Sequence, residues 1–410
     1  MSTSETTSAS TEAGRYESAL AELAVRQGAN LQPGQILALS SEPGKESLTR
    51  AIAEAAYLAG AKFVDLTVFD VYLKRARALY ADRESLTFVP PWMGERALAL
   101  GEHRCARIAL SGPVAPAALD GVDPDLIALD ALPRVPEAMK ILNDRTTNWS
   151  IVPCPTPAWA SLVYPELEPA AALDRLWTEV AHICRLDEPD PTAAWEARLA
   201  QLVSVTERLD ALHLDALHFQ GPGTDLTVGL LASSKWCAAK FSTIDGIEHQ
   251  PNIPTEEAFT TPDPTRTHGY VTSTKPLFTS GTTITGLKVR FEEGRAVQID
   301  ADQGADVLRG LAARDEGAAC LGEVALVDRE GRIGPLGTVF YDTLLDENAA
   351  SHIALGQGYH MGIGSEDDAD RVNASEIHVD FMIGSDAVAV TGIRADGEEI
   401  PLLREGIWQI

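Results

Sequence analysis

The 410-residue chain has few cysteines, and their positions exclude several kinds of site. It contains five, an odd number, and no two of them form a CxxC pair: Cys105, Cys154, Cys184, Cys237 and Cys320. The odd count and the wide spacing argue against a framework of disulfide bonds and against a zinc site built from thiolates. Because free cysteines persist in reducing compartments, the sequence favours a cytoplasmic protein.

The sequence also lacks the long apolar run that a membrane-spanning helix requires. No stretch approaches the roughly 18 apolar residues expected of such a helix, so we expect no membrane partner. The first fourteen residues, MSTSETTSASTEAG, are rich in Ser and Thr. They have neither the apolar centre of a signal peptide nor the arginines of a transit peptide. We therefore expect residues 1–14 to form a disordered extension.

Basic residues are scarce relative to acidic ones. The chain has 33 Lys and Arg against 60 Asp and Glu, which gives a net charge of -27. An acidic surface repels a phosphate backbone, so we expect no nucleic acid partner. The same electric field favours cationic ligands, among them the free amino terminus of a peptide.

No nucleotide-binding fingerprint accompanies the clearest βαβ pattern, at residues 35–70. There QILALS and FVDLTVFD predict strands, and the apolar residues between them recur at helical spacing before Gly60. The first strand leads into SSEPGKES, which lacks GxGxxG, and Leu39 stands where a Walker glycine is needed. A βαβ unit implies a parallel sheet, and further strand patterns extend it. We predict an open α/β N-terminal domain at residues 15–190.

The sequence changes character after the acidic, proline-broken segment LDEPDPT at residues 186–192. A helix with one apolar stripe follows. Beyond it, glycine-containing runs alternate between apolar and polar residues, and KVRFEEGRAVQI predicts a β-hairpin. We predict a second, mixed but mostly antiparallel domain at residues 191–410, so the fold class combines α/β with α+β.

The sharpest local pattern in this second domain is His378-Val379-Asp380. Residues two apart on a strand point to the same face, so the imidazole and the carboxylate would reach one target. Val379 would then face the core. Because surface strands often contain an HxD pattern, we interpret it together with other polar groups in the same half of the chain.

Two of these groups interrupt apolar runs, where a polar side chain is costly to bury unless it is paired or bound to a metal. Glu323 lies in LGEVALV and His352 in SHIALG. Glu347 precedes His352 by five residues, and Glu257 follows NIPTE. Each has an ordinary alternative. Glu323 could be a salt-bridged core residue, His352 a hydrogen-bonded core histidine, and both Glu257 and Glu347 exposed acids.

If they converge, these side chains form a site of oxygen and nitrogen donors without thiolates, which is typical of catalytic rather than structural metal sites. The candidates are Glu257, Glu323, Glu347, His352, His378 and Asp380. One tetrahedral ion with an open water position needs fewer donors, whereas two ions that share a carboxylate account for the set. Such ions lie about 3.5–4 Å apart in hydrolases and lower the pKa of bound water towards about 7.

Around these residues the sequence resembles the M29 metallopeptidases, a family of two-metal aminopeptidases. The resemblance covers nearly the whole chain after the first dozen residues and rests on segments that occur in the same order. They are NLQPGQ, AYLAGAK, TNWSIVPCPTPAWA, RLDEPDPTAAW, FQGPGTDLTVGL, NIPTEEAFTTPD, LGEVALV, FYDTLLDENAASHIALGQGY and NASEIHVDFMIGS. The resemblance implies a hydrolase that cleaves the N-terminal residue from a peptide with a free amino terminus.

The resemblance also assigns roles to individual residues. It places the family's metal ligands on the six candidates above and its catalytic tyrosine on Tyr359, seven residues after His352. Residues 191–410 would then be the metal-binding catalytic domain, with two divalent ions drawn from zinc, cobalt, manganese or magnesium. The family further implies a homodimer that encloses its active sites.

Several points stay open at the level of sequence. Glu256 and Glu347 are both candidates for the general base. His360 stands where the family pattern has proline, and the loop at residues 361–371 is short and acidic, which affects the expected shape of the pocket. The competing enzyme class is an iron-dependent dioxygenase of the dihydroxypyridine type. The non-enzyme alternative is a scaffold protein whose metal site only stabilises the fold.

Overall fold

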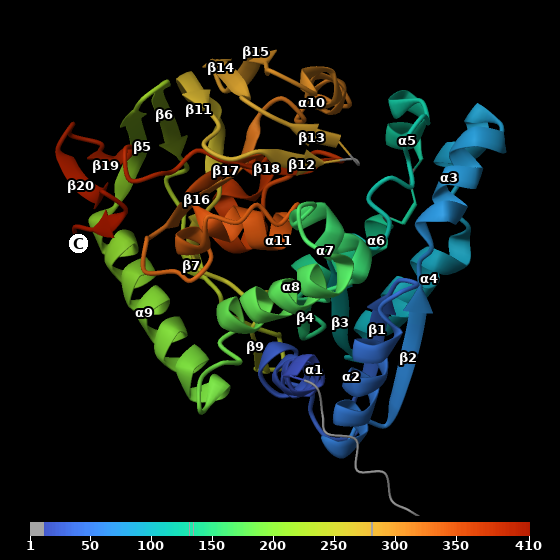
Figure 1. The fold of residues 1–410 in the computed structure, drawn as a ribbon. Helices are drawn as coiled ribbons and strands as arrows, with labels where there is room; N and C mark the ends of the chain where they lie inside the picture. The colour runs from blue at the N-terminus through green and yellow to red at the C-terminus, as the bar shows by residue number, and fades with distance from the viewer. Residues whose placement is uncertain (1–11, 131, 134, 280–281) are drawn as a thin grey trace, which may run out of the picture.

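The computed structural model describes residues 12–130, 132–133, 135–279 and 282–410 (Figure 1). Helix α1 begins at Glu12, so the last residues of the predicted extension 1–14 are helical. Residues 1–11 lie outside the described part of the chain. None of the described helices combines the length and the apolar character that a membrane crossing requires.

The first half of the chain builds a four-stranded parallel sheet, as the βαβ pattern predicts. The strand order is β2-β1-β3-β4, and each neighbouring pair runs parallel. Helix α2, which joins β1 to β2, buries Leu48, Ile52 and Ala56 at intervals of four residues. Gly60, with φ +94°, follows it in the left-handed conformation typical of a helix end. The strands are β1 (Ile36–Ser41), β2 (Phe63–Val68), β3 (Ala106–Ser111) and β4 (Trp149–Pro153).

Helices α1, α2, α7 and α8 pack with this sheet into one hydrophobic core. The second half of the chain completes this core with the buried side chains of Ile333, Phe340 and Leu345. The two halves are therefore joined through a shared interior. The helices of this part are α1 (Glu12–Leu23), α2 (Glu46–Leu58), α3 (Val71–Tyr80), α4 (Pro91–Glu102), α5 (Pro124–Leu129), α6 (Pro136–Asn143), α7 (Pro157–Val163) and α8 (Pro169–Ile183), with the short turns η1 (Ala24–Gly28) and η2 (Arg83–Thr87).

The predicted boundary at residues 190 and 191 coincides with the start of helix α9 (Pro191–Leu212). Asp190 caps this helix by accepting a hydrogen bond from the backbone N–H of Ala193 at 3.1 Å. Pro191 occupies the first turn, where its missing N–H costs nothing. The acidic, proline-broken segment is therefore a helix entry.

The described part of the second half contains two large antiparallel sheets and two small two-stranded ones, β12-β13 and β8-β9, which confirms the predicted combination of α/β with α+β. The strand orders of the large sheets are β18-β17-β16-β10-β7 and β15-β14-β11-β6-β5-β19-β20-β21. The predicted hairpin is formed by β14 and β15. The strands are β5 (Leu214–Gly221), β6 (Thr224–Leu230), β7 (Cys237–Ala238), β10 (Glu257–Thr260), β11 (Pro262–Thr272), β14 (Lys288–Glu292), β15 (Arg295–Asp300), β16 (Leu321–Val327), β17 (His352–Gly356), β18 (His378–Met382), β19 (Ala389–Arg394), β20 (Glu399–Arg404) and β21 (Ile407–Trp408).

The two large sheets contribute apolar side chains to a second core. Val324, Ile353 and Phe381 enter it from successive strands of the five-stranded sheet, because alternate residues of a strand point to the same face. Val379 also lies in this core, as the HxD pattern predicts. The remaining short elements are β8 (Phe241–Ser242), β9 (Glu248–His249), β12 (Leu277–Thr279), β13 (Thr282–Ile284), α10 (Ala305–Ala312), α11 (Thr343–Asp346), η3 (Gly334–Leu336), η4 (Glu347–Ala349), η5 (His360–Gly362) and η6 (Glu366–Arg371).

Candidate metal centre

One face of the five-stranded sheet carries polar residues that the sequence predicts as donors. Glu257 lies on β10, Glu323 on β16, His352 on β17, and both His378 and Asp380 on β18. These strands are consecutive neighbours in the sheet. The residues that alternate with the donors enter the second core, so the donor side chains share the opposite face.

Glu323 reaches this face because strand β16 is irregular. Its register against β17 shifts between Leu321 and Glu323. Leu321 and Val324 both lie in the second core although they are three positions apart, which a regular strand does not allow. Gly322 lies at the shift, and a Cβ there would lie 2.3 Å from the carbonyl oxygen of Gln357. A glycine is therefore required where the strand turns Glu323 outward.

The donor atoms form two groups that share Glu323. Glu257, Glu323 and His352 offer ligand atoms that lie within 4.8 Å of one another, and so do Glu323, His378 and Asp380. His352 Nε2 lies 3.6 Å from Glu323 Oε1, whereas His378 Nε2 lies 3.5 Å from Glu323 Oε2. Each oxygen of Glu323 thus faces a different group. Glu323 could therefore offer one oxygen to a metal ion in either group.

When neutral, both histidines can present an unprotonated nitrogen to the centre. His352 Nδ1 lies 3.1 Å from the carbonyl oxygen of Ala350, and His378 Nδ1 lies 2.8 Å from that of Gln357. A carbonyl oxygen only accepts, so in neutral imidazoles Nδ1 carries the proton and Nε2 keeps its lone pair. Glu257 Oε2 lies 3.1 Å from His352 Nε2, yet no described residue donates a hydrogen bond to it. Lone pairs that converge in this way fit a bound cation.

The centre carries an excess of negative charge. Burial raises the pKa of Glu347 well above its usual range, and the neighbouring charges of Asp380 and Glu257 raise it further. Burial would lower the pKa of His378, but the carboxylates of Asp380 and Glu323 raise it to about 9. Buried charge of one sign is costly unless it is compensated. Two divalent cations would balance the charge of Glu257, Glu323, Glu347 and Asp380.

Tyr359 lies against this donor face. Its ring centroid is 5.0 Å from that of His378 and 6.3 Å from that of Phe259. Burial raises the pKa of Tyr359 well above its ordinary value, and the carboxylates of Glu323 and Asp380 add to the effect. The phenol therefore stays protonated at neutral pH and can donate a hydrogen bond.

Comparison with known families agrees with this chemistry. The family model of the thermophilic metalloproteases, M29, matches residues 16–408. The chain belongs to the M29 metallopeptidase family. A metallopeptidase requires a divalent metal ion, and the donor groups around Glu323 contain the residue types that hold one.

Relatives of this M29 metallopeptidase are similar over almost their whole length. Aminopeptidase T from Thermus thermophilus is 41% identical over 399 residues, which cover 95% of this chain and 98% of the relative. Aminopeptidase PepS from Streptococcus thermophilus is 36% identical over 402 residues, which cover 95% and 97%. The solved structure of wild-type AmpT from Thermus thermophilus has a TM-score of 0.88 at 40% identity and covers 97% of this chain and 99% of that chain. These relatives give no support to the dioxygenase alternative.

Glu347 lies beside the two donor groups of the metallopeptidase without belonging to either. It is half-buried in the turn η4, directly after α11. The Nδ2 atom of Asn348 donates a hydrogen bond to Glu347 Oε1 at 3.4 Å. Turn η4 packs against β18, the strand that carries Asp380. The other five predicted donors form the compact groups, and Glu347 occupies their edge.

The structure removes Glu256 from the candidates for general base. Its side chain is fully buried and is held by two arginines. Arg185 Nη2 lies 2.8 Å from Glu256 Oε1, and Arg198 Nε lies 2.6 Å from Glu256 Oε2. Arg198 also pairs with Asp328 at 3.1 Å. Adjacent residues of an extended chain point in opposite directions, so Glu257 joins the donors and Glu256 enters this buried network.

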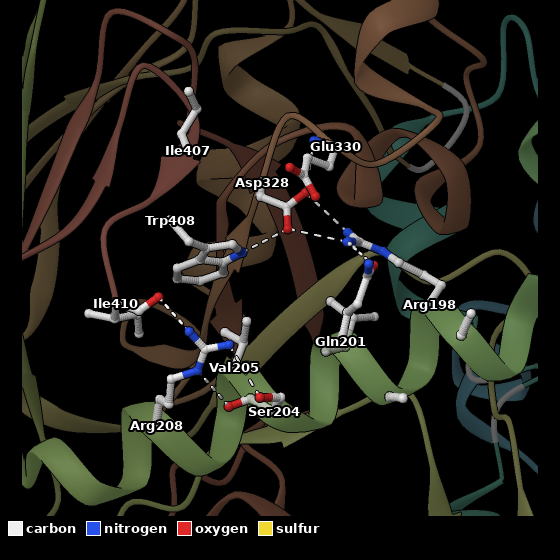
Figure 2. A pocket seen from close by; sticks show the side chains of 13 residues that line it. Arg198, Gln201, Ser204, Val205, Arg208, Asp328, Glu330, Ile407, Trp408 and Ile410 are labelled. Carbon is white, nitrogen blue, oxygen red and sulfur yellow. Dashed lines mark hydrogen bonds and ion pairs between the residues drawn. The ribbon is translucent and has the colours of Figure 1, made fainter.

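The same network borders a cavity of about 470 Å³ between α9 and β21 (Figure 2). Arg198 and Asp328 line it, and Trp408 Nε1 donates a hydrogen bond to Asp328 Oδ2 at 2.7 Å. Arg208 donates another to the carbonyl oxygen of Ile410 at 2.7 Å. Of the described residues that line this cavity, none belongs to the predicted site, so it is separate from the donor face.

No sequence pattern singled out the buried residues that pair with Glu256 or contact its backbone, next to the donor Glu257. They are Arg185, Arg198, Asp328 and Asn348. One signal was present, because Arg198 falls on the apolar stripe of α9 between the buried Trp195 and Leu199. An arginine at such a position needs a buried partner. His360 is exposed at the start of the turn η5.

Proposed function

We propose that this M29 metallopeptidase is an aminopeptidase that removes the N-terminal residue of peptides with the help of two divalent ions. The observation that carries the proposal is the pair of donor groups that share Glu323. Glu257 and His352 would hold one ion together with Glu323, and His378 and Asp380 would hold the other. Such ions, when bound, polarise the scissile carbonyl and lower the pKa of water.

The remaining polar groups would act on the substrate directly. Tyr359 would donate its phenol proton in a hydrogen bond to the oxyanion that develops on the scissile carbonyl. Glu347 lies at the edge of the donor groups, where its carboxylate would complete the set of metal ligands and is also a candidate to accept a proton from the attacking water and deliver it to the leaving amine. The acidic surroundings would attract the protonated amino terminus of the peptide.

Tyr359→Phe tests the role of the phenol. Removing one oxyanion donor typically lowers kcat by about 10²- to 10³-fold. We expect a loss of this size with KM and metal content little changed, because Tyr359 lies outside both donor groups. Steady-state kinetics on an aminoacyl p-nitroanilide would measure it. Tyr270→Phe, at an exposed tyrosine on β11, is the control. A kcat equal to that of the wild type would exclude Tyr359 as the donor.

The reaction class is tested with a pair of peptides that differ only at the amino terminus. We expect cleavage of the free peptide and at least about a hundredfold slower cleavage of its N-acetylated form, because acetylation removes the cationic group that the acidic centre recognises. Time-resolved mass spectrometry would follow both, with zinc, cobalt, manganese and magnesium added separately to metal-free protein. Equal cleavage of both peptides, or cleavage at internal bonds, would contradict an aminopeptidase.

We propose a reducing, cytoplasmic setting for this activity, without a nucleic acid partner. All five cysteines are free and buried. The net charge of -27 disfavours binding to a phosphate backbone.

We also propose that the protein forms a homodimer through the outer edge of its parallel sheet. Strand β2 is an edge strand and exposes Phe63. The nearby helices expose Leu73 by 70%, Tyr80 by 84% and Trp92 by 67%. Figure 1 shows β2, α3 and α4 together along one side of the molecule. Exposed apolar side chains gathered on one region mark an interaction site, and a second copy would cover them.

The combined variant Leu73→Glu and Tyr80→Glu tests this interface. Two charges in an apolar interface would be desolvated without partners, so we expect a monomer of 43.9 kDa instead of a dimer of twice that mass. Size-exclusion chromatography with light scattering would show the change. Tyr270→Glu introduces the same charge at an exposed tyrosine on β11 and is expected to leave the dimer intact. A dimeric double variant would place the interface elsewhere.

A further inference from the structure

We propose that Asn348 is a positioning residue, which holds the Glu347 carboxylate in a fixed relation to the strand that carries Glu257. The inference rests on the proposed function, because it treats both glutamates as parts of the metal centre. Asn348 contacts the backbone of Glu256 and the side chain of Glu347. It would act through the groups that it contacts.

The side chain of Asn348 joins two segments that are distant in sequence. It is 0% exposed. Its Oδ1 atom accepts a hydrogen bond from the backbone N–H of Glu256 at 2.6 Å. Its Nδ2 atom donates to the carbonyl oxygen of Leu344 at 3.0 Å and to Glu347 Oε1 at 3.4 Å. An amide supplies one acceptor and two donors, and here the acceptor and both donors are used.

The segment that contains Glu256, whose N–H bonds the Asn348 oxygen, is fixed by buried ion pairs. Arg185 and Arg198 bind the two carboxylate oxygens of Glu256. Since Glu256 directly precedes Glu257, the start of β10 is fixed by these buried ion pairs. The hydrogen bond from the Glu256 N–H therefore fixes the position of Asn348 relative to Glu257, a member of the first donor group.

The segment on the donor side is anchored to the first half of the chain. Trp159 Nε1 donates to the carbonyl oxygen of Phe340 at 2.5 Å, and the backbone N–H of Gly112 donates to Asp342 Oδ2 at 2.8 Å. Asp346 Oδ1 accepts a hydrogen bond from the Phe340 N–H at 2.7 Å. Helix α11 is thus held in place, and Glu347 follows it directly. Asn348 connects this anchored segment to the equally fixed strand β10.

A residue that hydrogen-bonds a donor carboxylate sets its orientation, and losing such a contact typically costs about 10- to 100-fold in metal affinity or activity. An aspartate at this position would keep the acceptor for the Glu256 N–H. It would replace the amide donor with an anionic oxygen facing Glu347 Oε1. The substitution therefore keeps the contact to β10 and removes both contacts of the amide donor, to Glu347 and to the carbonyl oxygen of Leu344.

The experiment compares Asn348→Asp with Asn148→Asp. Asn148 is also buried, and its Nδ2 atom donates to the carbonyl oxygen of Ala29 at 2.5 Å, on the parallel sheet. Metal-free protein of each variant is titrated with zinc in competition with a chelator, and folding is followed by circular dichroism. We expect Asn348→Asp to fold and to lose about 10- to 100-fold in zinc affinity. Asn148→Asp should lower the melting temperature and leave zinc affinity unchanged.

A double-mutant cycle with Glu347→Gln tests whether Asn348 acts through Glu347. The loss caused by Asn348→Asp should shrink when Glu347 no longer carries a charge, so additive effects would overturn the proposal. Wild-type zinc affinity in a folded Asn348→Asp variant would also overturn it. If that variant unfolds, Asn348→Ser repeats the test without the added charge, and unfolding of both would assign Asn348 to the fold alone. Zinc affinity is read without substrate, so the result stands apart from peptidase activity.

Discussion

Glu323→Gln is expected to remove at least one metal ion and to lower kcat/KM by about 10³-fold or more, since a metal supplies several kcal/mol of transition-state stabilisation. The two oxygens of Glu323 face different donor groups, at 3.6 Å from His352 Nε2 and 3.5 Å from His378 Nε2. Glutamine has the same size, but it has only one acceptor oxygen, and its NH₂ group turns positive hydrogens towards one ion. Elemental analysis of the purified protein and steady-state kinetics would measure the two effects together.

The matched control for Glu323→Gln is Glu399→Gln. Glu399 lies exposed on β20, outside the donor groups, and should keep wild-type metal content and turnover. Full occupancy of both ions would exclude Glu323 as a ligand.

Glu256→Gln is expected to destabilise the protein by about 3–5 kcal/mol, the cost of breaking a buried ion pair by removing one partner. The substitution removes the carboxylate that binds both buried guanidinium groups, and among the described residues only Arg198 keeps a direct ion pair, with Asp328. Burial lowers the pKa of Arg185, but not enough for an arginine to lose its proton, so the charge stays uncompensated. The midpoint of guanidinium-induced unfolding, recorded on metal-free protein, would report the loss.

An exposed ion pair provides the comparison for Glu256→Gln. Arg26 lies 3.0 Å from Glu22 with both side chains largely exposed, so Glu22→Gln should change stability by less than about 1 kcal/mol. If Glu256 were instead the general base, Glu256→Gln would lose turnover and keep wild-type stability. The unfolding midpoint and kcat of the same variant thus distinguish a structural residue from a catalytic one.

Strand alternation made much of the centre predictable from the sequence. His378 and Asp380 are two apart on β18, and Val379 between them enters the second core. Polar residues that interrupt apolar strands, such as Glu323 and His352, pointed to the same face because their burial requires a partner. The α/β pattern followed by glycine-punctuated alternation likewise anticipated a parallel sheet and then antiparallel ones.

Other features depend on contacts that no local pattern specifies. Simple alternation in LGEVALV puts Leu321 and Glu323 on one face, and only the register shift at Gly322 separates them. The neighbouring acids Glu256 and Glu257 look equivalent in sequence. Their different roles follow from the register of β10 and from Arg185 and Arg198, which bind the side chain of Glu256. Long-range partners of this kind are set by the tertiary fold.

The shared interior of the two halves limits how the chain can be divided. Ile333, Phe340 and Leu345 belong by sequence to the second half but are buried beside the parallel sheet. A fragment that begins at α9 would expose these side chains to water. It would also lose the contacts with the first half that fix the segment before Glu347. Recombination with a different protein at residue 190 would meet the same obstacle, even though the architecture changes there. The two halves are therefore expected to fold together and not as independent domains.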